Sequence, residues 1–104
     1  MGGEEEKTGK KINLVCDKRL DKYFDITSRA LEKVKESEKD AKRAKEAADF
    51  LDMANRYFSD AKHFREQDNY VLALAAINYA HAWLDAGARI GLFKVNDSEL
   101  FASD

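Results

Sequence analysis

The stretch that decides the fold is FLDMANRYFSDAKHFREQDNYVLALAAINYAHAWLDAGARIGLF, residues Phe50–Phe93. On both sides of the polar run Gln67–Asn69, apolar side chains recur every three or four residues, which is the period of an α-helix with a buried face. Asn and Asp in that run tolerate left-handed backbone dihedrals and can cap the helix that follows. The stretch therefore predicts a hairpin of two helices, over about 40–67 and about 70–91, with Gly91 suited to the C-terminal cap.

A further helix is expected before the hairpin, because apolar residues return at the same spacing between Leu20 and Val34. This pattern predicts a helix over about 17–36. Ser37, followed three residues later by Asp40, resembles a capping box and predicts a break there. Since the region contains neither glycine nor proline, the alternative is one long helix that buries its faces by dimerising.

Together these segments predict an all-α fold, an antiparallel three-helix bundle. The 104-residue chain has no proline and only five glycines, so it lacks the tight turns that an all-β fold needs. We expect one helical bundle domain over residues 13–104. Residues 1–12 are expected to form a disordered polar tail, because residues 1–11 hold three glutamates, three lysines and three glycines without an apolar anchor.

The C-terminal hairpin also has the spacing of a tetratricopeptide unit. The positions that fit are Tyr57, Ala61, Phe64, Tyr70, Ala73, Ile77 and Ala80. The chain holds only one such unit, and Asp60 stands where the repeat prefers an apolar residue. Any tight antiparallel hairpin needs small residues where its helices touch, so an ordinary hairpin fits the same pattern.

Composition narrows the function classes. The 18 basic and 20 acidic residues nearly balance, which describes solvated helix faces rather than a surface for nucleic acid. The most apolar stretch, residues 70–93, carries too many polar side chains for a membrane span. Cys16 is the single cysteine and no signal peptide is recognisable, so a cytoplasmic location is expected. The sequence predicts no catalytic residue and no cofactor.

The helix over 70–91 is apolar on almost every side. Its few polar side chains form a narrow stripe. Its polar members advance by three, four and four residues and so share one helix face. We include the aromatic Trp83 with these polar residues. The predicted interaction stripe is therefore Asn78, His81, Trp83, Asp85 and Arg89. The leading hypothesis is a non-enzymatic interaction module that presents this stripe to another protein or to a second copy of itself.

The alternative hypothesis is a small metal-dependent enzyme. If Asp60 and His63 on the preceding helix faced His81 and Asp85, two imidazoles and two carboxylates would approximate a metal site. No paired metal-ligand motif such as His-Glu-x-x-His supports that arrangement.

Two features near the C-terminus raise questions about how the chain packs there. Gly87 within a helix costs about 1 kcal/mol relative to alanine, so we expect another helix to approach closely there. Leu100 and Phe101 either dock on the bundle or remain free.

The segments YFSDAKHF, Tyr57–Phe64, and NYAHAWLDAGARIGLF, Asn78–Phe93, resemble a short archaeal family catalogued as domain of unknown function 357. The resemblance implies an archaeal cytoplasmic protein with a compact helical bundle. It brings no established activity, cofactor or catalytic residue to this chain.

Overall fold

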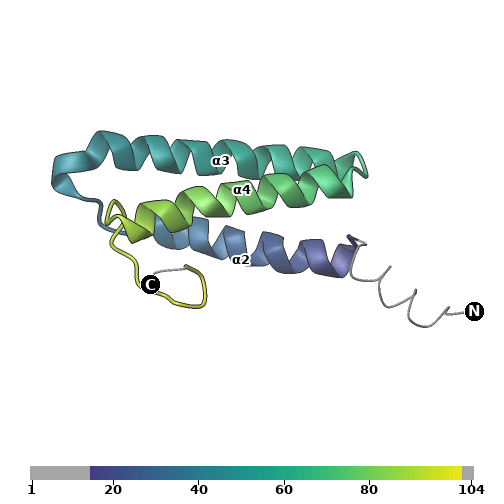
Figure 1. Ribbon diagram of the computed structural model, residues 1–104, viewed down its shortest axis with the longest axis horizontal. Helices are drawn as coiled ribbons and strands as arrows, with labels where there is room; N and C mark the ends of the chain where they lie inside the picture. Colours follow the sequence, from purple (N-terminus) through teal and green to yellow (C-terminus); the bar gives the residue numbers. More distant parts are fainter. Residues whose placement is uncertain (1–14, 102–104) are drawn as a thin grey trace, which may run out of the picture.

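The computed structural model describes residues 15–101, and its main elements are three α-helices (Figure 1). They are α2 (Asp17–Glu36), α3 (Ala44–Glu66) and α4 (Tyr70–Arg89), with the 3-10 turn η1 (Ala41–Arg43) before α3. The three predicted helices are confirmed, the first with the expected bounds. The predicted polar tail over residues 1–12 lies outside the described part of the chain.

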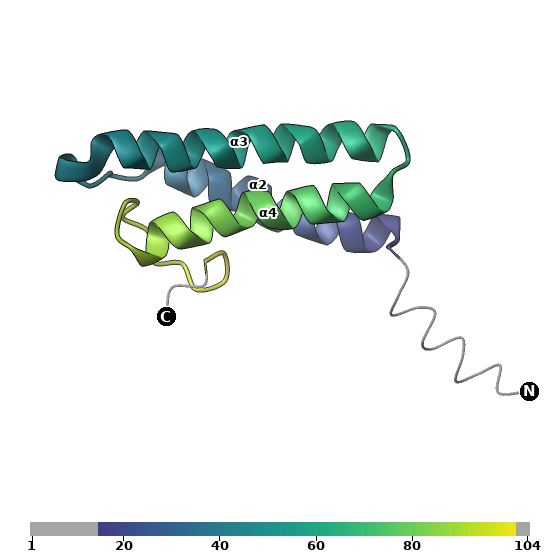
Figure 2. The ribbon, with the colours of Figure 1, turned by 45° about the horizontal axis from the view of Figure 1, so that its top comes forward.

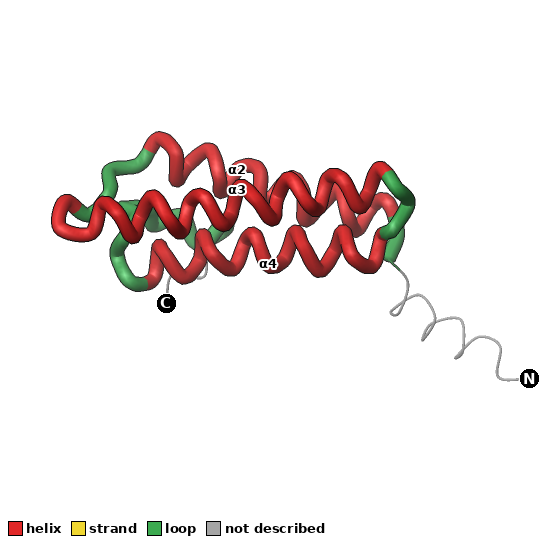
Figure 3. Tube along the Cα trace, turned by 90° about the horizontal axis from the view of Figure 1, so that it is seen from above, coloured by secondary structure: helices red, strands yellow, loops and turns green. Residues whose placement is uncertain are grey.

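The helices lie side by side with their axes roughly aligned. In Figure 1 the sequence colours run from right to left along α2, back along α3, and from right to left again along α4. Helices α3 and α4 pack against each other most extensively, and α2 packs more on α4 than on α3. Figure 2 and Figure 3 show the same grouping after rotation. Helix α4 is therefore covered by two neighbours and has one remaining side.

Small residues let α3 and α4 approach closely. Ala47, Ala54 and Ala61 are buried at intervals of seven along α3, and Ala73 and Ala80 are buried on α4. Larger side chains fill the space around these contacts. They include Leu20, Val34, Ile77 and Leu84, which are fully buried.

The turn between α3 and α4 forms as its sequence predicts. Asp68 adopts a left-handed conformation with φ of 61°, and the Asn69 amide donates to the Phe64 carbonyl at 2.9 Å. This is a Schellman-type helix end. The Asn69 side chain then accepts a hydrogen bond from the Leu72 amide at 3.2 Å and caps α4.

The predicted break between the first two helices is also present, although by different chemistry. Helix α2 ends at Glu36, where the Ser37 hydroxyl and the Lys39 ammonium both donate to the Val34 carbonyl. Asp40 makes no side-chain cap and instead accepts a hydrogen bond from Arg43 at 2.7 Å. The single long helix is therefore wrong. The capping box does not form; Asp40 is extended, η1 follows it, and α3 begins at Ala44 rather than at residue 40.

The segment after α4 belongs to the core. Gly91, with φ of 78°, ends the helix, which therefore stops at Arg89 instead of reaching residue 91. The chain then folds back, and backbone hydrogen bonds of 3.0 and 2.9 Å join Asp40 to Leu92 and Lys94 to Glu38. Four side chains from this segment are buried: Leu92, Phe93, Leu100 and Phe101. Of the two alternatives for Leu100 and Phe101, docking is the one observed.

Gly87 has a different neighbour from the one expected. A Cβ atom at this position would lie 2.7 Å from Cδ2 of the Phe93 ring, with Cε2 closer still. The expectation that another helix approaches Gly87 is thus wrong, because the returning C-terminal segment supplies the contact.

Within residues 15–101, no helix has the length and apolarity required to cross a membrane.

Candidate interaction surface

The predicted stripe on α4 does not form one surface, because the neighbouring helices divide it. Asn78 and Arg89 are exposed, whereas the other three members are half-buried. His81 contacts α2, but Trp83 contacts α3. The spacing in the sequence correctly predicts that these residues belong to one helix. It does not show which of them the adjacent helices cover.

His81 has a well-defined place between α2 and α4. Its Nδ1 lies 3.1 Å from the hydroxyl of buried Thr27, and its Nε2 lies 3.3 Å from a carboxylate oxygen of Asp85. A neutral imidazole protonated on Nε2 satisfies both contacts, donating to Asp85 and accepting from Thr27. His81 therefore links α4 to α2 through Thr27, and its contact with Asp85 lies within α4.

The four candidate metal ligands do not come together. Asp60 and His63 are exposed on α3, on either side of Ala61, whose side chain is the one that points into the core. Among the described residues, no group of three or more His, Cys, Asp or Glu side chains is placed to hold a metal ion. The hypothesis of a His/Asp cluster between these helices is therefore wrong.

Trp83 lies at the junction of α3 and α4. Its ring packs edge-on against Phe50, with centroids 4.9 Å apart, and against Tyr79 at 6.3 Å. The Nε1 atom is buried, and the described residues offer it no hydrogen-bond acceptor. Together with exposed Ala82 and Ala86, these three aromatic residues line a shallow hollow of about 260 Å³. This volume is smaller than most small-molecule sites and suits single side chains.

One row of exposed side chains on α4 is apolar from one end of the helix to the other. We call the row that follows it the outer face; its members, spaced by four, four, three, four and four residues, are Val71, Ala75, Tyr79, Ala82, Ala86 and Ile90. The three large side chains are 69%, 48% and 51% exposed, respectively. The row contains no charged residue, and the charges of Asp85 and Arg89 lie along one edge of it.

Sequence reasoning missed the outer face. The small residues of this helix that the sequence singles out are Ala73, Ala80 and Gly87, and all three are buried. The exposed alanines are the other set, Ala75, Ala82 and Ala86.

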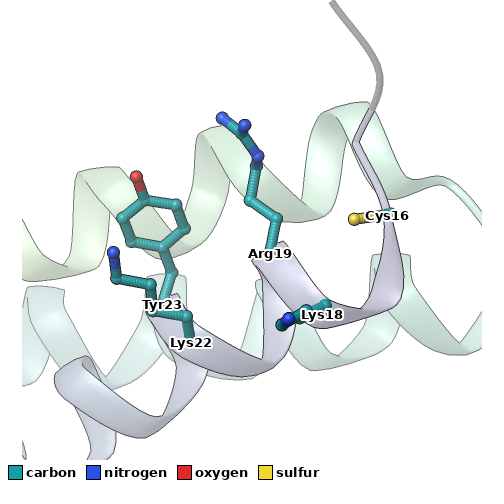
Figure 4. A pocket seen from close by; sticks show the side chains of 5 residues that line it. All are labelled: Cys16, Lys18, Arg19, Lys22 and Tyr23. Carbon is teal, nitrogen blue, oxygen red and sulfur yellow. The ribbon is translucent and has the colours of Figure 1, made fainter. Parts of the chain in front are cut away.

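The surface of α2 provides a contrast. Near its N-terminus, Cys16, Lys18, Arg19, Lys22 and Tyr23 line a shallow hollow (Figure 4). In Figure 4 the side chains of Arg19 and Lys18 point in different directions, so the cationic groups do not converge on one point. We interpret this region as a solvated charged surface.

A polar cluster holds α2 against the α3–α4 turn. Arg65 donates to Asp21 at 2.6 Å and to Asp17 at 3.4 Å, and the Tyr70 hydroxyl also donates to Asp17. The hydrogen bond from Tyr70, followed by that from Arg65, lowers the pKa of Asp17, and the same bond to Asp17 raises the pKa of Tyr70. The cluster thus joins the N-terminal end of α2 to the α3–α4 turn at the surface.

Comparison with known proteins identifies the family alone. No curated protein and no solved structure matches this chain. The model of the family described as "Protein of unknown function (DUF357)" matches residues 22–93, which include all of α3 and α4 and most of α2. The chain therefore belongs to the DUF357 family.

Proposed function

We propose that this protein is a non-enzymatic interaction module whose docking surface is the outer face of α4. The observation that supports this is the continuous exposure of apolar side chains along one helix, without a charged residue in the row. Apolar surface removed from water contributes about 25 cal/mol per Å². Contiguous apolar surface of this kind is typical of protein interaction sites.

The shape of the outer face favours a helix as its occupant. Exposed Ala75, Ala82 and Ala86 are short side chains, and Val71, Tyr79 and Ile90 rise around them. A second helix can approach α4 closely at these alanines and pack its own side chains beside the larger residues.

The predicted stripe takes a different role in this proposal. Asn78, Asp85 and Arg89 form a polar rim along one edge of the outer face, whereas Trp83 and Tyr79 form an aromatic edge on the other side. A polar rim beside an apolar centre is the usual arrangement of protein interfaces, and the rim fixes the orientation of the partner. His81 lies deeper and supports the surface through Thr27.

The α3–α4 hairpin, with its tetratricopeptide-like spacing, also has a role in this proposal. Ala61 and Ala73 are both fully buried at positions where that repeat uses small residues. We propose that the hairpin acts as a rigid antiparallel support that presents α4.

We also propose a cytoplasmic location. Exposed Cys16 has no disulfide partner, which is compatible with that location.

Photo-crosslinking tests this proposal. A photo-reactive side chain replaces Ala82 on the outer face or, as the matched control, exposed Ala48 on α3, and the protein is irradiated in the cells that produce it. We expect position 82 to give a defined protein adduct that position 48 does not give and that Ile90→Glu suppresses. The absence of adducts specific to position 82 would overturn the proposal.

A further inference from the structure

We infer that the occupant of the outer face is a second copy of this chain, bound with the two α4 helices antiparallel about a two-fold axis. This inference rests on the proposed function and names the partner. A two-fold interface requires one surface to be complementary to itself. The middle of the outer face lies between Tyr79 and Ala82. The face meets the requirement when each residue of one copy is paired with the residue of the other copy that lies equally far from this middle, on its opposite side.

The side-chain sizes match under this pairing. Residues equidistant from the midpoint face each other across an antiparallel two-fold pair, so Tyr79 of one copy lies over Ala82 of the other. The same operation places Ala75 over Ala86, which lets the helices approach, and Val71 over Ile90, which closes each end. A bulky residue therefore meets a small one near the centre, and apolar residues meet at both ends.

The edges of the face match as well. The two-fold axis brings the same edge of each helix together, so the aromatic edge of one copy meets that of the other. There, Leu72, which is 44% exposed, lies near Ile90 of the second copy, and the Tyr79 ring lies near Trp83. On the opposite edge, the Asn78 amide of one copy is within two residues' rise of the Asp85 carboxylate of the other, where it can donate a hydrogen bond. Among the residues of α4, no like charges are opposed.

This geometry makes residue 82 a sensitive probe. Ala82 lies next to the axis, so its two copies are only about three residues' rise apart, about 4.5 Å along the helix. A like charge introduced there by Ala82→Glu or by Ala82→Lys faces its own image. Because such juxtaposition is strongly unfavourable, we expect each variant alone to weaken self-association by about a hundredfold. A mixture of the two variants places opposite charges side by side.

The experiment is sedimentation equilibrium of the full chain from about 1 μM to about 1 mM, the range in which the face of one helix is expected to associate. We expect the wild type and the control Ala48→Glu to dimerise and each Ala82 variant to be monomeric. The equimolar mixture of Ala82→Glu and Ala82→Lys should recover a dimer. Far-UV circular dichroism of each variant reports whether the helices are retained.

Recovery in the mixture supports the inference directly, because two misfolded variants would not restore each other. A wild type that stays monomeric throughout overturns it, as do dimers that both Ala82 variants leave intact, or a mixture that stays monomeric. A monomeric wild type whose position 82 still crosslinks to a different protein would overturn self-pairing and leave the proposed function standing. Loss of both results would remove both proposals.

Discussion

The ring of Phe93 lies directly against the backbone of Gly87, where a Cβ atom would fall 2.7 Å from ring atom Cδ2. Phe93 is 1% exposed and helps to pack the returning C-terminal segment against the core. The absent side chain at position 87 therefore allows this segment to close over the end of the bundle.

Replacement of Gly87 by alanine should destabilise the protein. Alanine favours a helix by about 1 kcal/mol over glycine, but overpacking a buried contact costs about 1–3 kcal/mol. Because the Phe93 ring is itself buried, we expect a net loss in the free energy of unfolding, measured by urea denaturation. The loss should shrink in a Phe93→Leu background. A higher urea midpoint for Gly87→Ala would show that the ring does not occupy this place.

The C-terminal segment should contribute to stability as core does. Leu100 is 3% exposed, and its truncation by Leu100→Ala should lower the free energy of unfolding by about 2–5 kcal/mol. Ser98→Ala, at an exposed position in the same segment, should change it by less than about 0.5 kcal/mol. Equal, small effects from both changes would mean that the segment is not packed on the bundle.

Thr27→Val tests the polar link to His81. Valine keeps the shape of threonine and removes the hydroxyl that lies 3.1 Å from Nδ1 of His81. Since Thr27 is 2% exposed, the imidazole loses its partner on α2, and we expect a loss of about 1 kcal/mol in thermal unfolding experiments. Ser28→Ala, on the exposed side of α2, provides the control and should be neutral. An increase in stability for Thr27→Val would contradict the proposed contact.

The cluster at the N-terminus of α2 should make stability depend on pH. The hydrogen bond from Tyr70 and the neighbouring Arg65 lower the pKa of Asp17 below its usual 3.8. A carboxyl group whose pKa is lower in the folded state stabilises the protein above its unfolded pKa. That contribution is lost as the pH falls through the folded pKa. Asp17→Asn should therefore be less stable than the wild type at neutral pH, and the difference should vanish in acid.

Unfolding of both proteins, followed from pH 7 to about pH 2, measures this difference. Tyr70 gives the matching effect in alkali, because its raised pKa means that its stabilising contribution is lost as the pH rises above about 10. Tyr70→Phe should remove the alkaline effect. Parallel pH profiles for the wild type and Asp17→Asn would show that the cluster does not form.

Local chemistry made much of the fold predictable from sequence. The turn at Gln67–Asn69 carries its own conformational preferences, and α2 keeps the bounds that its apolar spacing predicts. The fold-back of Leu92–Phe101 was left open, because backbone hydrogen bonds such as Lys94 to Glu38 join distant segments without a local pattern.

The candidate site was predictable only in part for a related reason. Periodicity gives the angles between side chains around α4, but the positions of α2 and α3 decide which of them remain exposed. His81 and Trp83 were thus assigned to one stripe although they contact different helices. The outer face became visible only with both neighbours in place.

The most direct test of the central claim asks whether the outer face is covered in the cell. In a Cys16→Ser background, Ala82→Cys and the control Ala48→Cys each place one thiol at an exposed position, and the rate of alkylation by a small reagent is measured. We predict that in intact cells position 82 reacts severalfold more slowly than position 48, and that dilution of the purified protein abolishes the difference. Equal alkylation rates in cells would show that the outer face is open to solvent and would contradict its role as a docking surface.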